Sequence, residues 1–267
     1  MLNAAHPRAL LGIVFALILT GCVTLPANSK RQPQDPWESW NRGVYNVNDK
    51  LDRAVAKPIA KTYVRAVPAP ARTGISNVLS NLRMTTVMIN DGLQGKFGAA
   101  ATDFARFAIN LTVGFGGLLD PATQVGLDRN DEEFGQTLGV WGVPPGPFFE
   151  LPILGPSDVR DAPAKLVDYF TGPTHYIKNN WVAWGMYGVY LVDWRADLLS
   201  LEGQLKNVYD PYAFVRDAFL QRRAYLISDG KVSDEPLEDP GADDSQAAAP
   251  AAAPPPTTPS PPPSKPQ

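Results

Sequence analysis

Apolar residues recur at steps of three and four through the middle of the chain, the pattern of amphipathic α-helices. The first such stripe covers residues 37–55. Asp35 and Pro36 stand in front of it and are expected to supply the N-cap and a first-turn proline. Pro58 is expected to interrupt the stripe, with a second helix following through Tyr63.

Further stripes of the same spacing predict the remaining helices. They cover residues 75–82, 84–93, 97–111, 158–170 and 181–205, and a last helix opens at Asp210-Pro211 and carries apolar residues on one side as far as Leu226. Alternating apolar and polar runs, which would indicate strands, are scarce. We therefore expect an all-α fold.

Two apolar stretches are unusually rich in glycine or proline. Residues 109–119 are nearly uncharged and hold three glycines, and residues 138–156 carry Glu150 as their one charge. Glycine and proline at this density break regular structure. Two interpretations stay open: an ordinary buried loop, or irregular chain that lies against lipid or lines an amphipathic cavity, where the protein itself must satisfy its backbone groups.

Residues 181–194 combine three tryptophans with two tyrosines. Both residue types favour the headgroup level of a bilayer. The run is too short to span a membrane. It is expected to form either a buried core helix or an interfacial helix in the bilayer plane.

The beginning of the chain resembles a bacterial lipoprotein signal. Residues 1–21 contain Arg8 in a short first region and then an apolar run. The run ends in Leu19-Thr20-Gly21-Cys22, which resembles the lipoprotein cleavage box. Small residues allow a peptidase to reach the bond before the cysteine, and the thiol can take a thioether-linked lipid. Cys22 is therefore expected to be lipidated and to become the N-terminus, and Val23 in place of aspartate is consistent with outer-membrane sorting.

Composition divides the rest into three parts. Residues 22–34 are expected to be a linker, 35–227 a helical domain, and 228–267 an acidic and then Pro/Ala-rich tail. Such a tail cannot bury enough apolar area to offset the entropy of ordering. It is expected to be a disordered spacer or an arm that reaches toward peptidoglycan or a partner.

Several functional classes are disfavoured by composition. The net charge of −3 and the lack of an evident basic patch argue against nucleic-acid binding. The single cysteine excludes an internal disulfide, and His175 is the one histidine after the signal, which argues against histidine metal sites and Ser-His-Asp triads. An enzyme such as a lipid hydrolase is also disfavoured, because no Gly-x-Ser-x-Gly motif occurs. The acidic run 131–133 is interpreted as a solvated turn. We expect no catalytic site, cofactor or metal.

A series of short motifs follows in order along residues 35–227. The motifs are Asp35-Pro36-Trp37-Glu38 with Asn41-Arg42 and Tyr45-Asn46-Val47-Asn48, Arg106-Phe107 with Asn110 and residues 114–120, residues 134–139 with Gly142-Val143, Gly146-Pro147 through Arg160-Asp161, and Asp210-Pro211-Tyr212 through Arg222. Each is weak alone. Together, behind a lipoprotein box, they resemble the MlaA (VacJ) lipoprotein family.

The resemblance implies a fold and a function. It implies a ring-like bundle of amphipathic helices with Gly/Pro-rich apolar loops around a central channel, set in the inner leaflet of the outer membrane and lipid-anchored at the periplasmic side. Mislocalised outer-leaflet phospholipids would pass through the channel to a soluble periplasmic lipid carrier, which maintains lipid asymmetry. A trimeric porin would be a further partner. The alternative is a structural lipoprotein that bridges porins and peptidoglycan through its tail.

Two groups of residues are candidates within that channel. Polar groups near the passage are expected at Asn41, Arg42, Asn46 and Asn48. The alternative for Asn41 and Arg42 is structural hydrogen bonding to neighbouring helices. A flexible gating loop is expected at Gly114, Phe115, Gly116 and Gly117. The alternative for these glycines is close packing between two helices.

Overall fold

The computed structural model describes residues 32–205 and 208–231, all within one compact unit of the chain. Cys22 and the tail from 232 onward lie outside the described residues. The elements, in order, are α2 (Glu38–Leu51), η1 (Asp52–Ala56), α3 (Lys57–Ala66), α4 (Ala69–Leu93), α5 (Phe97–Thr112), α6 (Pro121–Gln124), α7 (Phe134–Val140), β1 (Phe148–Leu151), β2 (Gly155–Asp158), α8 (Asp161–Thr171), η2 (Pro173–Tyr176), α9 (Asn180–Asp197), η3 (Leu198–Ser200), α10 (Glu202–Leu205) and α11 (Pro211–Ile227).

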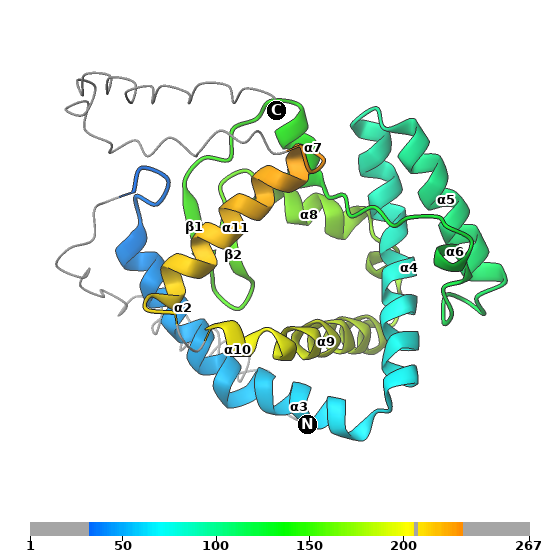
Figure 1. The fold of residues 1–267 in the computed structure, drawn as a ribbon, viewed down its shortest axis with the longest axis horizontal. Helices are drawn as coiled ribbons and strands as arrows, with labels where there is room; N and C mark the ends of the chain where they lie inside the picture. The colour runs from blue at the N-terminus through cyan, green and yellow to red at the C-terminus, as the bar shows by residue number, and fades with distance from the viewer. Residues whose placement is uncertain (1–31, 206–207, 232–267) are drawn as a thin grey trace, which may run out of the picture. The chain divides into compact units, whose positions relative to one another are not determined.

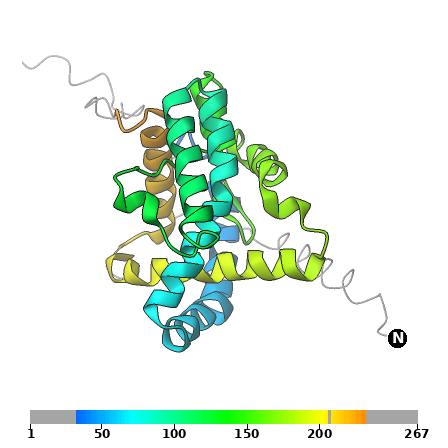
Figure 2. The ribbon, with the colours of Figure 1, turned by 90° about the vertical axis from the view of Figure 1, so that its right-hand side faces the viewer.

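The helices of this unit follow one another around its middle (Figure 1). α2 and α3 lie along the lower left, α4 rises on the right, and α8, α7 and α11 lie on the upper side. α4 packs against α5, α3 against α9 and α7 against α8. α4 and α5 run side by side in both views (Figure 2). The expectation of an all-α fold with a ring-like order of helices is confirmed, apart from one short hairpin.

The start of the first helix differs from the prediction. Trp37, not Asp35, occupies the N-cap position of α2, and its side chain makes no capping hydrogen bond. Asp35 is instead buried, with its carboxylate turned to other partners. The expectation that Asp35 caps this helix is therefore wrong, because tertiary contacts take the carboxylate that a local cap would have used.

Pro58 does not end the helix, contrary to the sequence prediction. The chain stays helical from Glu38 to Ala66, with the π-helical turn η1 directly before Pro58. In an α-helix the ring of Pro58 would clash with the carbonyl four residues earlier. In η1 the Lys57 N–H donates to the carbonyl of Asp52, five residues back, which widens the helix at the point where the ring needs room.

Other boundaries also moved. The stripes 75–82 and 84–93 form one continuous helix, α4, because no residue between them breaks it. The predicted helix 181–205 is divided at Asp197, where η3 and then α10 follow α9. The helix predicted from 158 starts at Asp161 because residues 155–158 form a strand. The start of α11 is as predicted: Asp210 caps it and accepts from the Ala213 N–H at 3.1 Å.

A two-stranded hairpin lies within the Gly/Pro-rich stretch 138–156 and its continuation. β1 and β2 pair antiparallel, with Phe148 opposite Asp158 and Leu151 opposite Gly155. Phe148 is fully buried, and its ring centroid lies 5.9 Å from that of Phe219 on α11. The sequence did not predict these strands because each is four residues long and apolar and polar residue types do not alternate along it.

Candidate functional site

Polar and charged side chains fill the interior of this unit. Among the described residues, more polar than apolar side chains are buried, whereas a water-soluble helical protein buries mainly apolar ones. A buried charge is costly unless it is paired and hydrogen-bonded. The partners of these groups therefore show how the interior is held together.

The first group, which we name the Asp35 cluster, comprises Asp35, Asn41, Tyr212 and Arg216. The Asp35 carboxylate accepts from Asn41 Nδ2 at 2.8 Å, from the Tyr212 hydroxyl at 2.5 Å and from Arg216 Nη1 at 3.3 Å. Burial, reinforced by Asp35, raises the pKa of Tyr212, so its hydroxyl keeps the proton it donates. The cluster ties the chain before α2 to α11, which are far apart in sequence.

Arg42 makes a second link between α2 and α11. Its Nη1 and Nη2 donate to Asp210 at 3.0 and 2.6 Å, and its Nε donates to Glu38 at 2.8 Å. The hydrogen bonds with Asp210 raise the pKa of Arg42 and lower that of Asp210. Because Asp210 also caps α11, this bidentate ion pair fixes where that helix begins.

Asn41 and Asn48, seven residues apart on α2, hold the hairpin. Asn41 accepts from the Glu150 N–H at 3.0 Å and donates to the Phe148 carbonyl at 3.2 Å. Asn48 accepts from the Ile153 N–H at 2.8 Å and donates to Glu150 Oε1 at 3.1 Å. These are structural contacts of the kind the sequence left open for Asn41, although with a hairpin rather than a helix. Asn46 lies between them and is exposed.

The glycine block at residues 114–117 continues the end of α5 as a tight turn. The Gly117 N–H donates to the Asn110 carbonyl at 2.8 Å, and Phe115, Gly116 and Gly117 have φ of 53°, 75° and 90°. A Cβ on Gly114 would lie 2.5 Å from the Leu119 carbonyl oxygen, so close backbone approach requires glycine there. A Cβ on Gly116 would meet nothing within 4 Å.

Beneath this block a charged group secures the turn. Arg106 Nη2 pairs with Asp120 at 3.1 Å, and Asn110 Nδ2 donates to the same carboxylate at 2.9 Å. Asn110 Oδ1 accepts from the Ala122 N–H at 3.1 Å. Arg106 and Asn110 therefore lie inside, Asp120 is half-buried, and the apolar side chain of Phe115 projects outward with 78% of its surface exposed.

The acidic run 131–133 is not a solvated turn, which corrects the sequence interpretation. Glu132 is buried and pairs with Lys96 at 2.9 Å, and Asp131 pairs with Arg83 at 2.9 Å. Glu133 pairs with Arg223, which also contacts Asp161 at 2.5 Å. The run connects α4, α7 and α11, so its charges are structural.

Three buried carboxyl groups and one half-buried carboxyl group, that of Asp168, have pKa values raised toward neutrality. Burial raises the pKa of Asp91 and Glu150 to about 7, and that of Asp158 and Asp168 to about 6. A proton on such a group removes the cost of burying its charge. The polar interior is therefore only partly ionised at neutral pH.

Large apolar side chains cover much of the outside. On α9, Trp181 and Trp184 are 88% and 72% exposed, while Asp193 and Ala196 are the residues of that helix that are buried. The interpretation of residues 181–194 as a buried core helix is therefore wrong. Apolar exposure on this scale exceeds scattered surface residues and indicates an interaction surface.

The residues that sequence reasoning missed are polar residues within apolar helices. Asp91, Asp103 and Asn90 are buried on α4 and α5, although the buried faces of these helices were predicted from apolar residues alone. By contrast, polar residues of the quoted motifs, such as Arg106 and Arg216, do lie in the interior. In the parts of the chain that the structure covers, no helix combines the length and apolar character needed to cross a membrane.

Comparison with known proteins relates this arrangement to one family. The profile of the family described as MlaA lipoprotein matches residues 33–226. The intermembrane phospholipid transport system lipoprotein MlaA of Escherichia coli is 35% identical over 233 residues, covering 84% of this chain and 90% of the relative. The protein of the same description from Haemophilus influenzae is 33% identical, with 86% and 95% covered.

A solved structure agrees with the sequence comparison. It comes from work on the structural basis for maintenance of bacterial outer membrane lipid asymmetry and aligns with a TM-score of 0.67 and 36% identity. The alignment covers 74% of this chain and all of that one. Sequence, fold and motif order thus lead to one conclusion: the chain belongs to the MlaA lipoprotein family.

Proposed function

We propose that the protein is an outer-membrane lipoprotein of intermembrane phospholipid transport, which removes phospholipids from the outer leaflet and so maintains lipid asymmetry. One observation carries this proposal: polar and charged side chains fill the interior and large apolar side chains cover the exterior, in a chain that belongs to a transport family. Acyl chains can contact the apolar exterior, and a polar headgroup can be accommodated only where polar side chains offer partners. The role is transport rather than enzymatic chemistry, as the family assignment indicates.

The anchor and the protein partners belong to the same proposal. A lipid on Cys22 holds the chain at the periplasmic side of the membrane. A trimeric porin stabilises it there, and a soluble periplasmic carrier accepts the phospholipid. Cys22→Ser tests the anchor: the variant should remain an unprocessed precursor or leave the membrane fraction, and normal processing with outer-membrane fractionation would contradict it.

Lipid transfer from reconstituted membranes to the purified carrier tests the function itself. The full-length protein should speed the appearance of phospholipid on the carrier and restore detergent resistance to a strain lacking the gene. A structural scaffold would restore membrane integrity without any transfer. Absence of transfer by folded, membrane-inserted protein would overturn the proposal.

Within the proposed channel, Asn46 is the sharpest test of the four polar candidates. No other described residue hydrogen-bonds to its exposed side chain, so its amide is free to meet a headgroup. Asn46→Leu should slow transfer without lowering the unfolding temperature. Asn41→Leu is the contrasting variant, because it breaks the bonds to Phe148 and Glu150 and should lower that temperature.

The glycine block is proposed as the gate of this channel. Gly116 is the informative position, because a methyl group fits there but opposes a φ of 75°. If the block moves during transport, Gly116→Ala should change the transfer rate while leaving the amount of folded protein unchanged. Gly92→Ala, in open space on α4, is the matched control. Equal transfer by both variants and the parent would discard the gate.

A further inference from the structure

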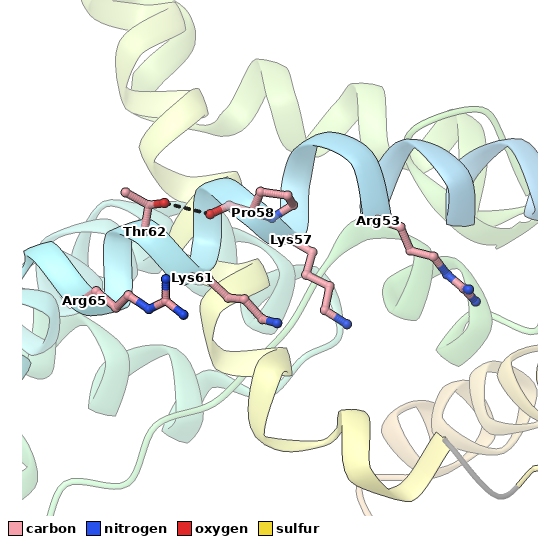
Figure 3. Close-up of a pocket in the computed structure, with 6 residues that line it drawn as sticks. All are labelled: Arg53, Lys57, Pro58, Lys61, Thr62 and Arg65. Atoms are coloured by element: carbon pink, nitrogen blue, oxygen red, sulfur yellow. Dashed lines mark hydrogen bonds between the residues drawn. The ribbon is translucent and has the colours of Figure 1, made fainter.

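Four basic residues form a line on one side of η1 and α3. Arg53, Lys57, Lys61 and Arg65 follow one another at intervals of four residues, and their side chains project from the same side of the helix (Figure 3). We name this line the basic stripe. Along the sequence no basic patch is evident, because the net charge of the whole chain is negative and the four residues are separated by uncharged ones.

The π-helical turn helps to align the stripe. In a regular α-helix, residues four apart turn about 40° around the axis at each step, so a line of four would drift by about 120°. The wider turn of η1, at Asp52–Ala56, lowers that drift between Arg53 and Lys57. The feature that accommodates Pro58 thus also brings Arg53 toward the other cations.

Two of the four charges are balanced within the protein. Arg53 pairs with Asp49 at 2.9 Å and Lys57 with Glu202 at 2.7 Å. Among residues 32–205 and 208–231, Lys61 and Arg65 have no carboxylate at ion-pair distance. The stripe therefore presents two unbalanced positive charges at its Arg65 end.

A groove of about 450 Å³ runs along these side chains. Its remaining lining residues are Pro58 and Thr62, and no carboxylate contributes to it. The Thr62 hydroxyl donates to the Pro58 carbonyl at 2.9 Å and stays with the backbone (Figure 3). The groove is open, cationic and of the size of a small-ligand site.

The residues beside the groove indicate what kind of anion it would bind. Ala60 is buried, and the Tyr63 hydroxyl donates to Asp193 on α9 at 2.9 Å, which fixes one face of α3 to the protein. Leu51, Val55 and Ile59 are exposed large apolar residues on the same helical run. A helix with cations beside an exposed apolar face is suited to the boundary between headgroups and acyl chains.

We propose that the basic stripe is a docking surface for anionic phospholipids, with the headgroup phosphate at Lys61 and Arg65 and the acyl chains along Val55 and Ile59. Each cation near an anionic lipid surface contributes favourably to binding. A phosphatidylglycerol-type lipid, whose net charge is negative, is then bound more tightly than a zwitterionic one. The inference rests on the proposed function, because it assumes that the protein lies at a phospholipid membrane.

Native mass spectrometry of the full-length, detergent-purified protein tests this surface. The probes are dioctanoyl-phosphatidylglycerol, dioctanoyl-phosphatidylcholine and inorganic phosphate. The parent should prefer phosphatidylglycerol, and Lys61→Gln/Arg65→Gln should bind it roughly thirtyfold more weakly, since two cations of roughly 1 kcal/mol each are lost. Binding of phosphatidylcholine, which carries the same phosphate but no net charge, should weaken much less.

The matched control is Arg222→Gln/Lys231→Gln, which removes one arginine and one lysine from exposed positions outside the stripe. It should bind phosphatidylglycerol as the parent does. Equal phosphatidylglycerol binding by the stripe variant and the parent would overturn the proposal. Inorganic phosphate that displaces the lipid at equal concentration would also overturn it, because the stripe would then be a simple anion site.

The same preparations separate this inference from the proposed function. A parent that transfers phospholipid to the carrier but shows no preference for phosphatidylglycerol contradicts the docking surface alone. A parent with that preference and no transfer contradicts the transport proposal alone. Loss of carrier binding in the stripe variant with unchanged lipid binding would identify an acidic protein as the occupant and overturn the lipid proposal.

Discussion

The Asp35 cluster and the glycine block at 114–117 both consist of motif residues, yet the chain uses them in opposite ways. The cluster places a carboxylate, an amide, a phenol and a guanidinium inside, where each hydrogen-bonds to another element. The block turns the chain over the ion pair of buried Arg106 with half-buried Asp120 and sends Phe115 outward. In the cluster, side chains determine the fold; in the block, backbone geometry brings an apolar residue to the surface.

This difference shows how a chain can keep a defined fold with an apolar exterior. The hydrophobic effect that normally gathers apolar side chains inside is weak for a surface in contact with lipid. Directional hydrogen bonds and ion pairs must then specify how the helices meet. Substitutions inside should therefore lower stability, whereas those outside should alter contact with lipid.

The largest effect is expected at Asp35. Asp35→Ala leaves the buried Tyr212 hydroxyl without its acceptor, removes one of the two acceptors of the Asn41 amide and takes one carboxylate from Arg216. Breaking such a buried pair costs about 3–5 kcal/mol of unfolding free energy. Thermal unfolding in detergent measures it. Asp217→Ala is the control, because Asp217 pairs with the same Arg216 but is 44% exposed, and it should cost about 1 kcal/mol or less. Equal losses in the two variants would contradict the distinction.

Glu150 should give the next largest effect, as a pH dependence. Its pKa is raised by burial from 4.5 to about 7, so between these pH values the folded protein holds a proton that the unfolded chain releases. The stability contributed at low pH is therefore lost as pH rises through this window and does not return above pH 7. Glu150→Gln should remove this contribution, amounting to about 3 kcal/mol between pH 4 and 8. Parallel stability-against-pH curves for parent and variant would contradict the prediction.

A smaller loss of stability is expected at Gly114. A Cβ there would lie 2.5 Å from the Leu119 carbonyl oxygen, so Gly114→Ala forces the backbone to move. Such overpacking costs about 1–3 kcal/mol. Gly98→Ala, where a Cβ meets nothing within 4 Å, should cause no loss. An unchanged unfolding temperature for Gly114→Ala would show that the turn is less closely packed than described.

The smallest effect on stability is expected at Trp181. Its side chain is 88% exposed, so Trp181→Ser removes little packing and should change the unfolding free energy in detergent by about 0.5 kcal/mol or less. A loss as large as that of Asp35→Ala would mean that the aromatic surface of α9 packs within the protein.

The helices could be predicted from sequence because amphipathic spacing is local. α5 and α11 lie close to their predicted positions, and Asp210 caps α11 as the sequence indicated. The role of Asp35 could not be predicted, since its partners Tyr212 and Arg216 lie about 180 residues away. From the local sequence the carboxylate was expected to cap the nearest helix, but in the structure it bonds to residues that are distant in sequence.

The candidate site shows the same limit. The polar residues proposed on α2 were chosen from a motif, and the structure gives Asn41 and Asn48 bonds to a hairpin that sequence periodicity could not reveal. The basic stripe, in contrast, is visible in the spacing of residues 53, 57, 61 and 65. The net charge of −3 does not reveal it, because only the helical spacing brings the four separated cations to one side.

An apolar exterior that faces lipid is the feature on which both the fold and the proposed transport depend. Cys22 is the one cysteine of the chain, so once it is acylated as proposed, an introduced cysteine is the one free thiol for a spin label. Labels at Phe115→Cys and Trp181→Cys, in protein reconstituted into bilayers, should relax strongly with oxygen and weakly with a water-soluble nickel complex. A label at Arg222→Cys, on a side chain that is 70% exposed, should show the reverse. Equal nickel accessibility at all three positions would contradict the central claim.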